Sequence, residues 1–161
     1  MNRNRITAGP KSIVCQETEL RGEISIGTVL HPQCRIIAEN GPVYIGKNNI
    51  IEENVVIFNK HELTNFEDVE GSRIGNNNII EARGRVLGNT SIGNYCVIGA
   101  GCLTENNETL PDSTVIYGAE SKRRTQNEPL ATQAALHARH LDYLQEVLPK
   151  YNHLKKLESS M

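Results

Sequence analysis

A repeat of six residues constrains the fold of this chain more than any other feature of its sequence. Every sixth residue from Ile74 to Ile116 is aliphatic at seven of eight positions, and a similar series runs through the N-terminal half. An α-helix repeats its faces every 3.6 residues and a plain strand every two, so neither accounts for this period. The sixteen repeat positions are Val14, Leu20, Ile26, Leu30, Ile36, Ile45, Ile51, Ile57, Ile74, Ile80, Val86, Ile92, Ile98, Thr104, Leu110 and Ile116.

The neighbours of the repeat positions follow the same period. The next residue is glycine in five units, at Gly27, Gly46, Gly75, Gly93 and Gly99. The residue two before is usually small or β-branched, with Asn49, Asn78 and Glu108 as the exceptions. The series is broken by a shortened step before Leu30 and by a three-residue insertion before Ile45. Three registers that agree over many units indicate one repeated structural element.

A period of six predicts short strands joined by corners, with three strands to each turn of a triangular prism. Residues eighteen apart then stack, so that Ile74 lies beneath Ile92, and Ile80 beneath Ile98. One coil cannot bury its own face, and the series supplies about five coils that stack on each other. The composition agrees: sixteen isoleucines suit a thin core, and seventeen asparagines with thirteen glycines suit frequent corners.

This pattern resembles the hexapeptide-repeat family, whose fold is a left-handed parallel β-helix. The resemblance implies an all-β solenoid with a C-terminal α-helix, and its left-handedness comes from the resemblance alone, since crossovers are usually right-handed. We expect the β-helix to span residues 1–118.

Residues 58–72 leave the repeat, and we expect them to form a loop that projects from a corner of the prism. The segment is acidic and also carries apolar side chains. Long loops on rigid scaffolds often bind partners, so the candidate partner contacts are Leu63, Phe66, Glu67 and Asp68. The alternative is a solvated insertion whose apolar residues fold back onto the coils.

The pattern changes again after residue 118. Residues 119–129 read as a basic linker, and residues 130–157 have a helical period with a broad apolar face. Pro129 suits the start of a helix, and Pro149 should end or kink it. A face this broad must be buried, which predicts a helix packed along the flank of the β-helix.

The charge and composition exclude several functions. The net charge is −2, so we expect no binding to nucleic acid or to anionic membranes. No apolar run reaches membrane-spanning length, and residues 1–10 do not resemble a secretory signal, which predicts a soluble intracellular protein. Cys34, Cys96 and Cys102 occupy small inward positions and should act as core fillers rather than metal ligands.

The hexapeptide-repeat family includes zinc enzymes related to carbonic anhydrase and acyltransferases, both of which form homotrimers. A three-histidine zinc site is not expected, because only His31 lies in the predicted coils. An acyltransferase would use a histidine base, for which His61 is the candidate, and Lys122, Arg123 and Arg124 could hold coenzyme A. We expect a surface histidine and a solvated linker instead, and we predict no catalytic, metal or cofactor site.

Four stretches resemble the β-helical subunits of the dynactin pointed-end complex. They are RIIAENGPVYIG (35–46), NIIEENVVI (49–57), TVIYGAESKRR (114–124) and LPKYNHLKK (148–156). The resemblance implies a non-enzymatic subunit in the cytoplasm, associated with microtubules, that supports cargo and adaptor attachment for dynein. It implies pairing with dynactin subunit 5 and contact with the pointed-end actin-related protein. A homotrimeric hexapeptide-repeat enzyme is the alternative.

Overall fold

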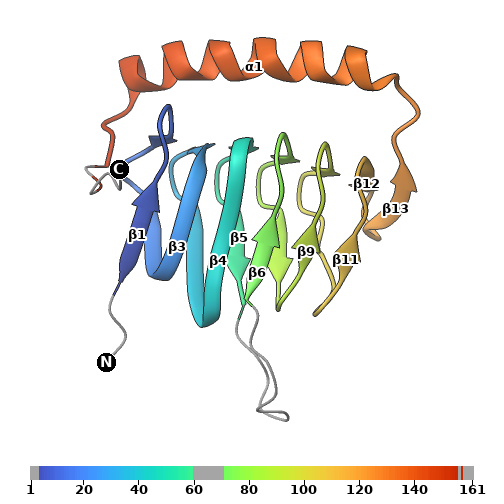
Figure 1. Cartoon of the computed structure of the whole chain (residues 1–161), viewed down its shortest axis with the longest axis horizontal. Helices are drawn as coiled ribbons and strands as arrows, with labels where there is room; N and C mark the ends of the chain where they lie inside the picture. Colours follow the sequence, from blue (N-terminus) through green and yellow to red (C-terminus); the bar gives the residue numbers. More distant parts are fainter. Residues whose placement is uncertain (1–3, 60–70, 156, 158–161) are drawn as a thin grey trace.

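A computed structural model of the chain describes residues 4–59, 71–155 and 157. Its strands stack in three parallel columns, which we name faces A, B and C, and one helix lies alongside (Figure 1). The solenoid has about six turns, and the predicted left-handed parallel β-helix with a C-terminal helix is confirmed. The stack is longer than the five coils expected, because strand β1 (Arg5–Ala8) adds a unit before the first repeat position.

Two long strands, β3 (Glu19–Leu30) and β4 (Arg35–Ile51), run through all three faces. Face A also contains β1, β6 (Ser72–Ile74), β9 (Ser91–Ile92) and β11 (Thr109–Leu110). Face B contains β2 (Ile13–Val14), β7 (Ile79–Ile80), β10 (Val97–Ile98), β12 (Thr114–Tyr117) and the antiparallel β13 (Lys122–Thr125). Face C contains β5 (Val56–Phe58) and β8 (Arg85–Leu87).

The register between coils reproduces the repeat, including its irregular steps. Partners in the second half are eighteen residues apart, as in Ile74 with Ile92 and Ile80 with Ile98. The separation is 29 residues between Ile45 and Ile74, eleven more than the regular value. Those eleven residues are 60–70, which lie outside the described part of the chain. Insertions are therefore confined to corners, and the faces keep their stacking.

The core is a column of the repeat positions. All sixteen are buried, and most of them are fully enclosed aliphatic side chains. The residue two before the repeat position is also buried in every unit except those of Ser12 and Glu108, and this includes Asn49 and Asn78, which are each 1% exposed. Asn78 donates from Nδ2 to the Gly93 carbonyl at 2.8 Å and accepts from the Cys96 amide at 2.7 Å. The buried amide is tolerated because it satisfies the corner backbone.

A second ladder of side chains runs along the outside of the corner between faces A and B. The Asn76 side-chain oxygen accepts the Lys47 amide, Asn94 accepts the Asn76 amide, and Asp112 accepts the Asn94 amide, at 2.7–2.8 Å. The coils approach so closely here that glycine precedes Lys47, Asn76 and Asn94. A Cβ atom on Gly75 would collide with the Gly93 carbonyl oxygen.

Helix α1 (Leu130–Tyr151) lies along the outside of face B and runs from the last coil back to the first (Figure 1). At 1.5 Å per residue its length is about 33 Å, enough to span six strands spaced about 4.8 Å apart. Its buried residues Leu141, Leu144 and Leu148 pack against Val29 and Ile50. Among the described residues, no helix has the length and apolar character needed to cross a membrane.

Three boundaries differ from the sequence-based expectations. The segment expected to be a linker, 119–129, contains β13, which turns back along the last coil. The helix ends at Tyr151 rather than near residue 157, and Pro149 lies in its last turn. The expected loop 58–72 begins later and ends earlier, because Phe58 and Ser72 belong to strands β5 and β6.

The close approach at the A–B corner yields a testable prediction. Gly75→Ala should lower the free energy of unfolding by about 1–3 kcal/mol, because its Cβ atom must displace the next coil. Gly9 occupies the equivalent position at the A–B corner of the first coil. A Cβ atom there would meet nothing closer than the Ile26 carbonyl oxygen at 3.6 Å. Gly9→Ala should therefore be neutral or slightly stabilising. Urea unfolding followed by circular dichroism measures both, and equal effects would contradict the steric explanation.

Candidate functional site

The partner contacts predicted from the sequence cannot be placed in the fold. Leu63, Phe66, Glu67, Asp68 and the candidate base His61 all lie outside the described residues. The residues that flank them lie at the corner between faces C and A, in the middle of the stack. Here Asn59 is buried and donates to the Gly41 carbonyl at 2.8 Å, while Ser72 donates to the Gly88 carbonyl at 2.8 Å. The insertion therefore starts from a firmly bonded corner, away from both ends of the solenoid.

The last coil is closed on face B by the segment that the sequence analysis treated as a linker. Strand β13 pairs antiparallel with β12, from Thr114 with Thr125 to Tyr117 with Lys122. The polar sequence KRRT has no apolar alternation, so nothing in it predicts a strand. It forms one because the edge of β12 offers unpaired backbone groups.

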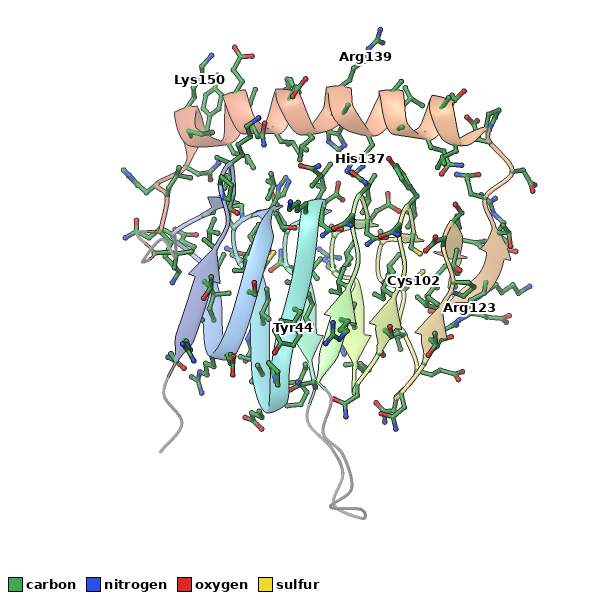
Figure 2. The ribbon with its side chains drawn as sticks, viewed as in Figure 1. Tyr44, Cys102, Arg123, His137, Arg139 and Lys150 are labelled. Carbon is green, nitrogen blue, oxygen red and sulfur yellow. The ribbon has the colours of Figure 1, made fainter. Side chains whose placement is uncertain are left out.

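Arg123 fixes β13 to face C of the preceding coil (Figure 2). Its guanidinium donates to both carboxylate oxygens of Glu108, at 2.9 and 2.7 Å, and to the Leu103 carbonyl at 3.1 Å. Both side chains are mostly shielded, with 29% and 18% exposed. Burial by itself would raise the pKa of Glu108, but the hydrogen bonds and charge of Arg123 outweigh it, and the pKa is lowered.

The C-terminal segment closes face B at the opposite end. Beyond the helix, Leu154 forms an antiparallel bridge with Cys15 on the first coil. The Gln16 amide donates to the His153 carbonyl at 2.7 Å, and the Lys155 amide donates to the Val14 carbonyl at 2.8 Å. Leu157 packs against the core cluster. We call β13, α1 and residues 152–155 and 157 the clasp, because together they cover face B at both ends and along its outer surface.

The clasp leaves strand edges open on face A. Strand β1 pairs with β3 alone, and β11 pairs with β9 alone, among the residues that the structure describes. Near the last coil, Leu103 and Tyr117 are each 41% exposed, and the Arg124 guanidinium lies 5.6 Å from the Tyr117 ring centre. Open edges and exposed apolar groups at a solenoid end are the features that a partner protein would cover.

The histidines within the described residues serve the clasp or the surface. His137 is buried beneath the helix (Figure 2), where its Nε2 hydrogen-bonds the Asn48 carbonyl and its ring stands edge-on to Tyr95 at 6.4 Å. His31 is half-buried on face B, rather than pointing freely outward as expected, and burial lowers its pKa. Burial also lowers the pKa of His137, against the effect of its hydrogen bond to Asn48, and nearby His140 lowers both.

The cysteines are buried and free. Burial raises the pKa of the Cys34 thiol to about 12, despite hydrogen bonds from the backbone that favour the thiolate. A thiol held in this protonated form is a poor nucleophile and a poor ligand. Within residues 4–59, 71–155 and 157, no three His, Cys, Asp or Glu side chains lie together as a metal site would require.

One signal for the clasp was present in the sequence. The residue just before each repeat position points outward, and on face A it is mostly polar: Thr7, Ser25, Tyr44, Arg73, Ser91 and Thr109. On face B it is apolar in every coil: Ile13, Val29, Ile50, Ile79, Val97 and Val115. Reading this register every eighteen residues identifies the face that the helix covers.

Comparison with known proteins places the chain among close relatives. No family model matches it. It is 41% identical to dynactin subunit 6 of Nematostella vectensis, across 97% of this chain and 95% of that protein. It is 38% identical to dynactin subunit 6 of Danio rerio (97% and 89% covered) and 34% identical to that of Dictyostelium discoideum (91% and 86% covered).

Solved structures with the same fold are far more distant in sequence. A hexapeptide transferase family protein from Anaplasma phagocytophilum superposes with a TM-score of 0.63 at 11% identity, over 91% of this chain and 92% of that chain. The polySia-specific acetyltransferase NeuO gives 0.62 at 16% identity, over 84% and 73%. At such low identity these likenesses establish the fold and nothing about chemistry.

The Arg123–Glu108 pair should contribute measurably to stability. Arg123→Met should lower the free energy of unfolding at pH 7 by about 1–3 kcal/mol, because a shielded carboxylate loses its partner. The pair is effective above the ordinary pKa of Glu108, about 4.5, and its contribution disappears as the pH falls through the lowered folded value. Lys122→Met is the control, since Lys122 and Glu120 are exposed and 3.9 Å apart. An equal loss in both variants, or one that persists at pH 2, would refute the assignment.

The buried histidines predict that the clasp weakens in acid. A histidine whose folded pKa is lowered takes up a proton more readily when unfolded, so stability falls as the pH drops below about 6.5. The paired substitution His31→Gln with His137→Gln should reduce the change in urea midpoint between pH 7.5 and 5.5. The surface variant His153→Gln should leave that change as it is in the parent, and a paired variant that also matched the parent would contradict the prediction.

Proposed function

This chain belongs to the dynactin subunit 6 family, and on that premise we propose that it is a non-catalytic structural subunit of dynactin. The observation that carries the proposal is similarity over nearly the whole chain, 97% of which is covered by the match to the Nematostella relative. A shared fold alone would not distinguish a scaffold subunit from an acetyltransferase, because both use the same solenoid.

The geometry supports a scaffold role. The clasp covers face B and leaves the open edges of face A, the ends of the solenoid and its corners available for association. Its described histidines are engaged in packing the helix or lie on the surface, and the thiol of Cys34 is held protonated. Such a rigid rod with unpaired strand edges at both ends suits a subunit that is placed between larger neighbours.

The proposed partners follow from the family. The chain pairs with dynactin subunit 5, a related β-helical subunit, and lies beside the pointed-end actin-related protein. It thereby supports attachment of dynein to cargo and adaptors in the cytoplasm, on microtubules. The loop residues Leu63, Phe66, Glu67 and Asp68 are proposed to contribute to these contacts, with no part in binding nucleic acid or inserting into a membrane.

Native mass spectrometry of the purified chain, alone and co-expressed with dynactin subunit 5, tests this proposal. We expect a one-to-one complex with subunit 5 and no homotrimer of the chain alone. A stable homotrimer that binds acetyl-coenzyme A would instead indicate a hexapeptide-repeat enzyme, whose active sites lie between identical subunits.

A charge-reversal pair tests the loop separately. Glu67→Lys with Asp68→Lys should weaken co-purification with subunit 5 about tenfold or more if the loop is part of the interface. Asp142→Lys with Glu146→Lys makes the same charge change on the exposed side of the helix and should have no effect. Unchanged co-purification of the loop variant would remove the loop from the interface without affecting the family assignment.

A further inference from the structure

The second coil lacks two residues at the A–B corner, where the other five coils have a projecting turn. The register shows this directly: Ile26 pairs with Ile45, Gly27 with Lys47, and Val29 with Ile50, so the offset grows by two residues across the corner. The other coils each place one non-glycine residue at positive φ here, namely Lys11, Asn48, Asn77, Tyr95 and Ser113. The second coil has no such residue, because the chain passes from Gly27 to Thr28 without the turn.

The missing turn leaves a notch between the first and third coils. It has a volume of about 550 Å³, and the apolar side chains of Val29 and Leu141 form part of its wall. The backbone at Gly9, Gly27 and Gly46 also lines it. A notch of this size, with a largely apolar lining, has the dimensions of an ordinary binding pocket.

Two lysines border the notch from opposite sides. Lys11 lies on the turn of the first coil and Lys47 on that of the third, and both line the cavity and are exposed. Neither forms an ion pair with any carboxylate in the part of the chain that the structure describes. Two exposed lysines that line a largely apolar hollow favour a ligand that carries negative charge.

The position of the notch favours a polypeptide as the ligand. Thr7 of β1 lines it, and β1, like β11 at the other end of face A, has an outer edge with no neighbour among the described strands. A segment that added to this edge by backbone pairing would lead directly to the notch, where its side chains could reach both lysines.

We propose that this notch binds an acidic segment of a partner protein, with carboxylates paired to Lys11 and Lys47. The inference goes beyond the proposed dynactin role, and it names a surface on the chain itself. Its binding can be measured with the isolated chain, so its failure would leave the family role untouched.

The test measures binding of a fluorescently labelled hexaglutamate peptide to the full chain at low salt. Lys11→Gln with Lys47→Gln should weaken binding at least tenfold. Lys122→Gln with Lys150→Gln removes the same charge from sites elsewhere and should change affinity less than twofold. Insertion of Asn-Asn between Gly27 and Thr28 rebuilds the missing turn and should abolish binding while both lysines remain.

Circular dichroism at the same temperature verifies that each variant is folded. If the insertion variant is unfolded, the comparison of the two double lysine variants tests the proposal by itself. Absence of saturable binding to the parent would overturn the proposal, as would an equal loss in both lysine pairs. Displacement of the peptide by millimolar inorganic phosphate, with phosphate binding as tightly, would overturn it in favour of a small-anion site.

Discussion

Parallel pairing between successive coils is the interaction on which the rest of this structure depends. Each coil buries its inward aliphatic residues against the coils before and after it, so the core is a column rather than a globule. Ile45, Ile74 and Ile92 illustrate this: each stacks on the equivalent residue of the next coil, whatever the length of chain between them. The faces therefore tolerate no change in register, while the corners tolerate changes of two, three or eleven residues.

A column of parallel strands necessarily has two ends with unpaired backbone groups. In this chain those groups are covered on face B and left open on face A. Strand β13, helix α1 and the segment after the helix close face B, by pairing with the last coil, crossing the outside, and pairing with the first. β13 and Leu154 each run antiparallel to the coil edge that they join, so the chain can turn back on itself at both ends of the solenoid. Among the described residues face A has no equivalent cover, and the open edges of β1 and β11, with the notch beside β1, offer surfaces to other proteins there.

The same solenoid serves acetyltransferases and a dynactin subunit family, so the function of each must come from what is attached to the prism. In this chain the prism carries two additions, the clasp and the acidic insertion between β5 and β6. It also lacks two residues after Gly27. His137 is held by the Asn48 carbonyl and Tyr95 beneath the helix. Side-chain type alone would not have separated these roles.

The period of six determined the interior: which residues are buried, how the coils stack, and where the chain turns, because side-chain burial in a repeating coil depends only on local spacing. It also located the irregular corners. The tertiary structure decided the rest. Lys122–Thr125 becomes a strand, and Leu154 leaves the helical pattern to meet Cys15, because the coil edges they join exist only once the solenoid has formed. The notch arises likewise, since a deletion becomes a hollow only between two neighbouring coils that keep the turn.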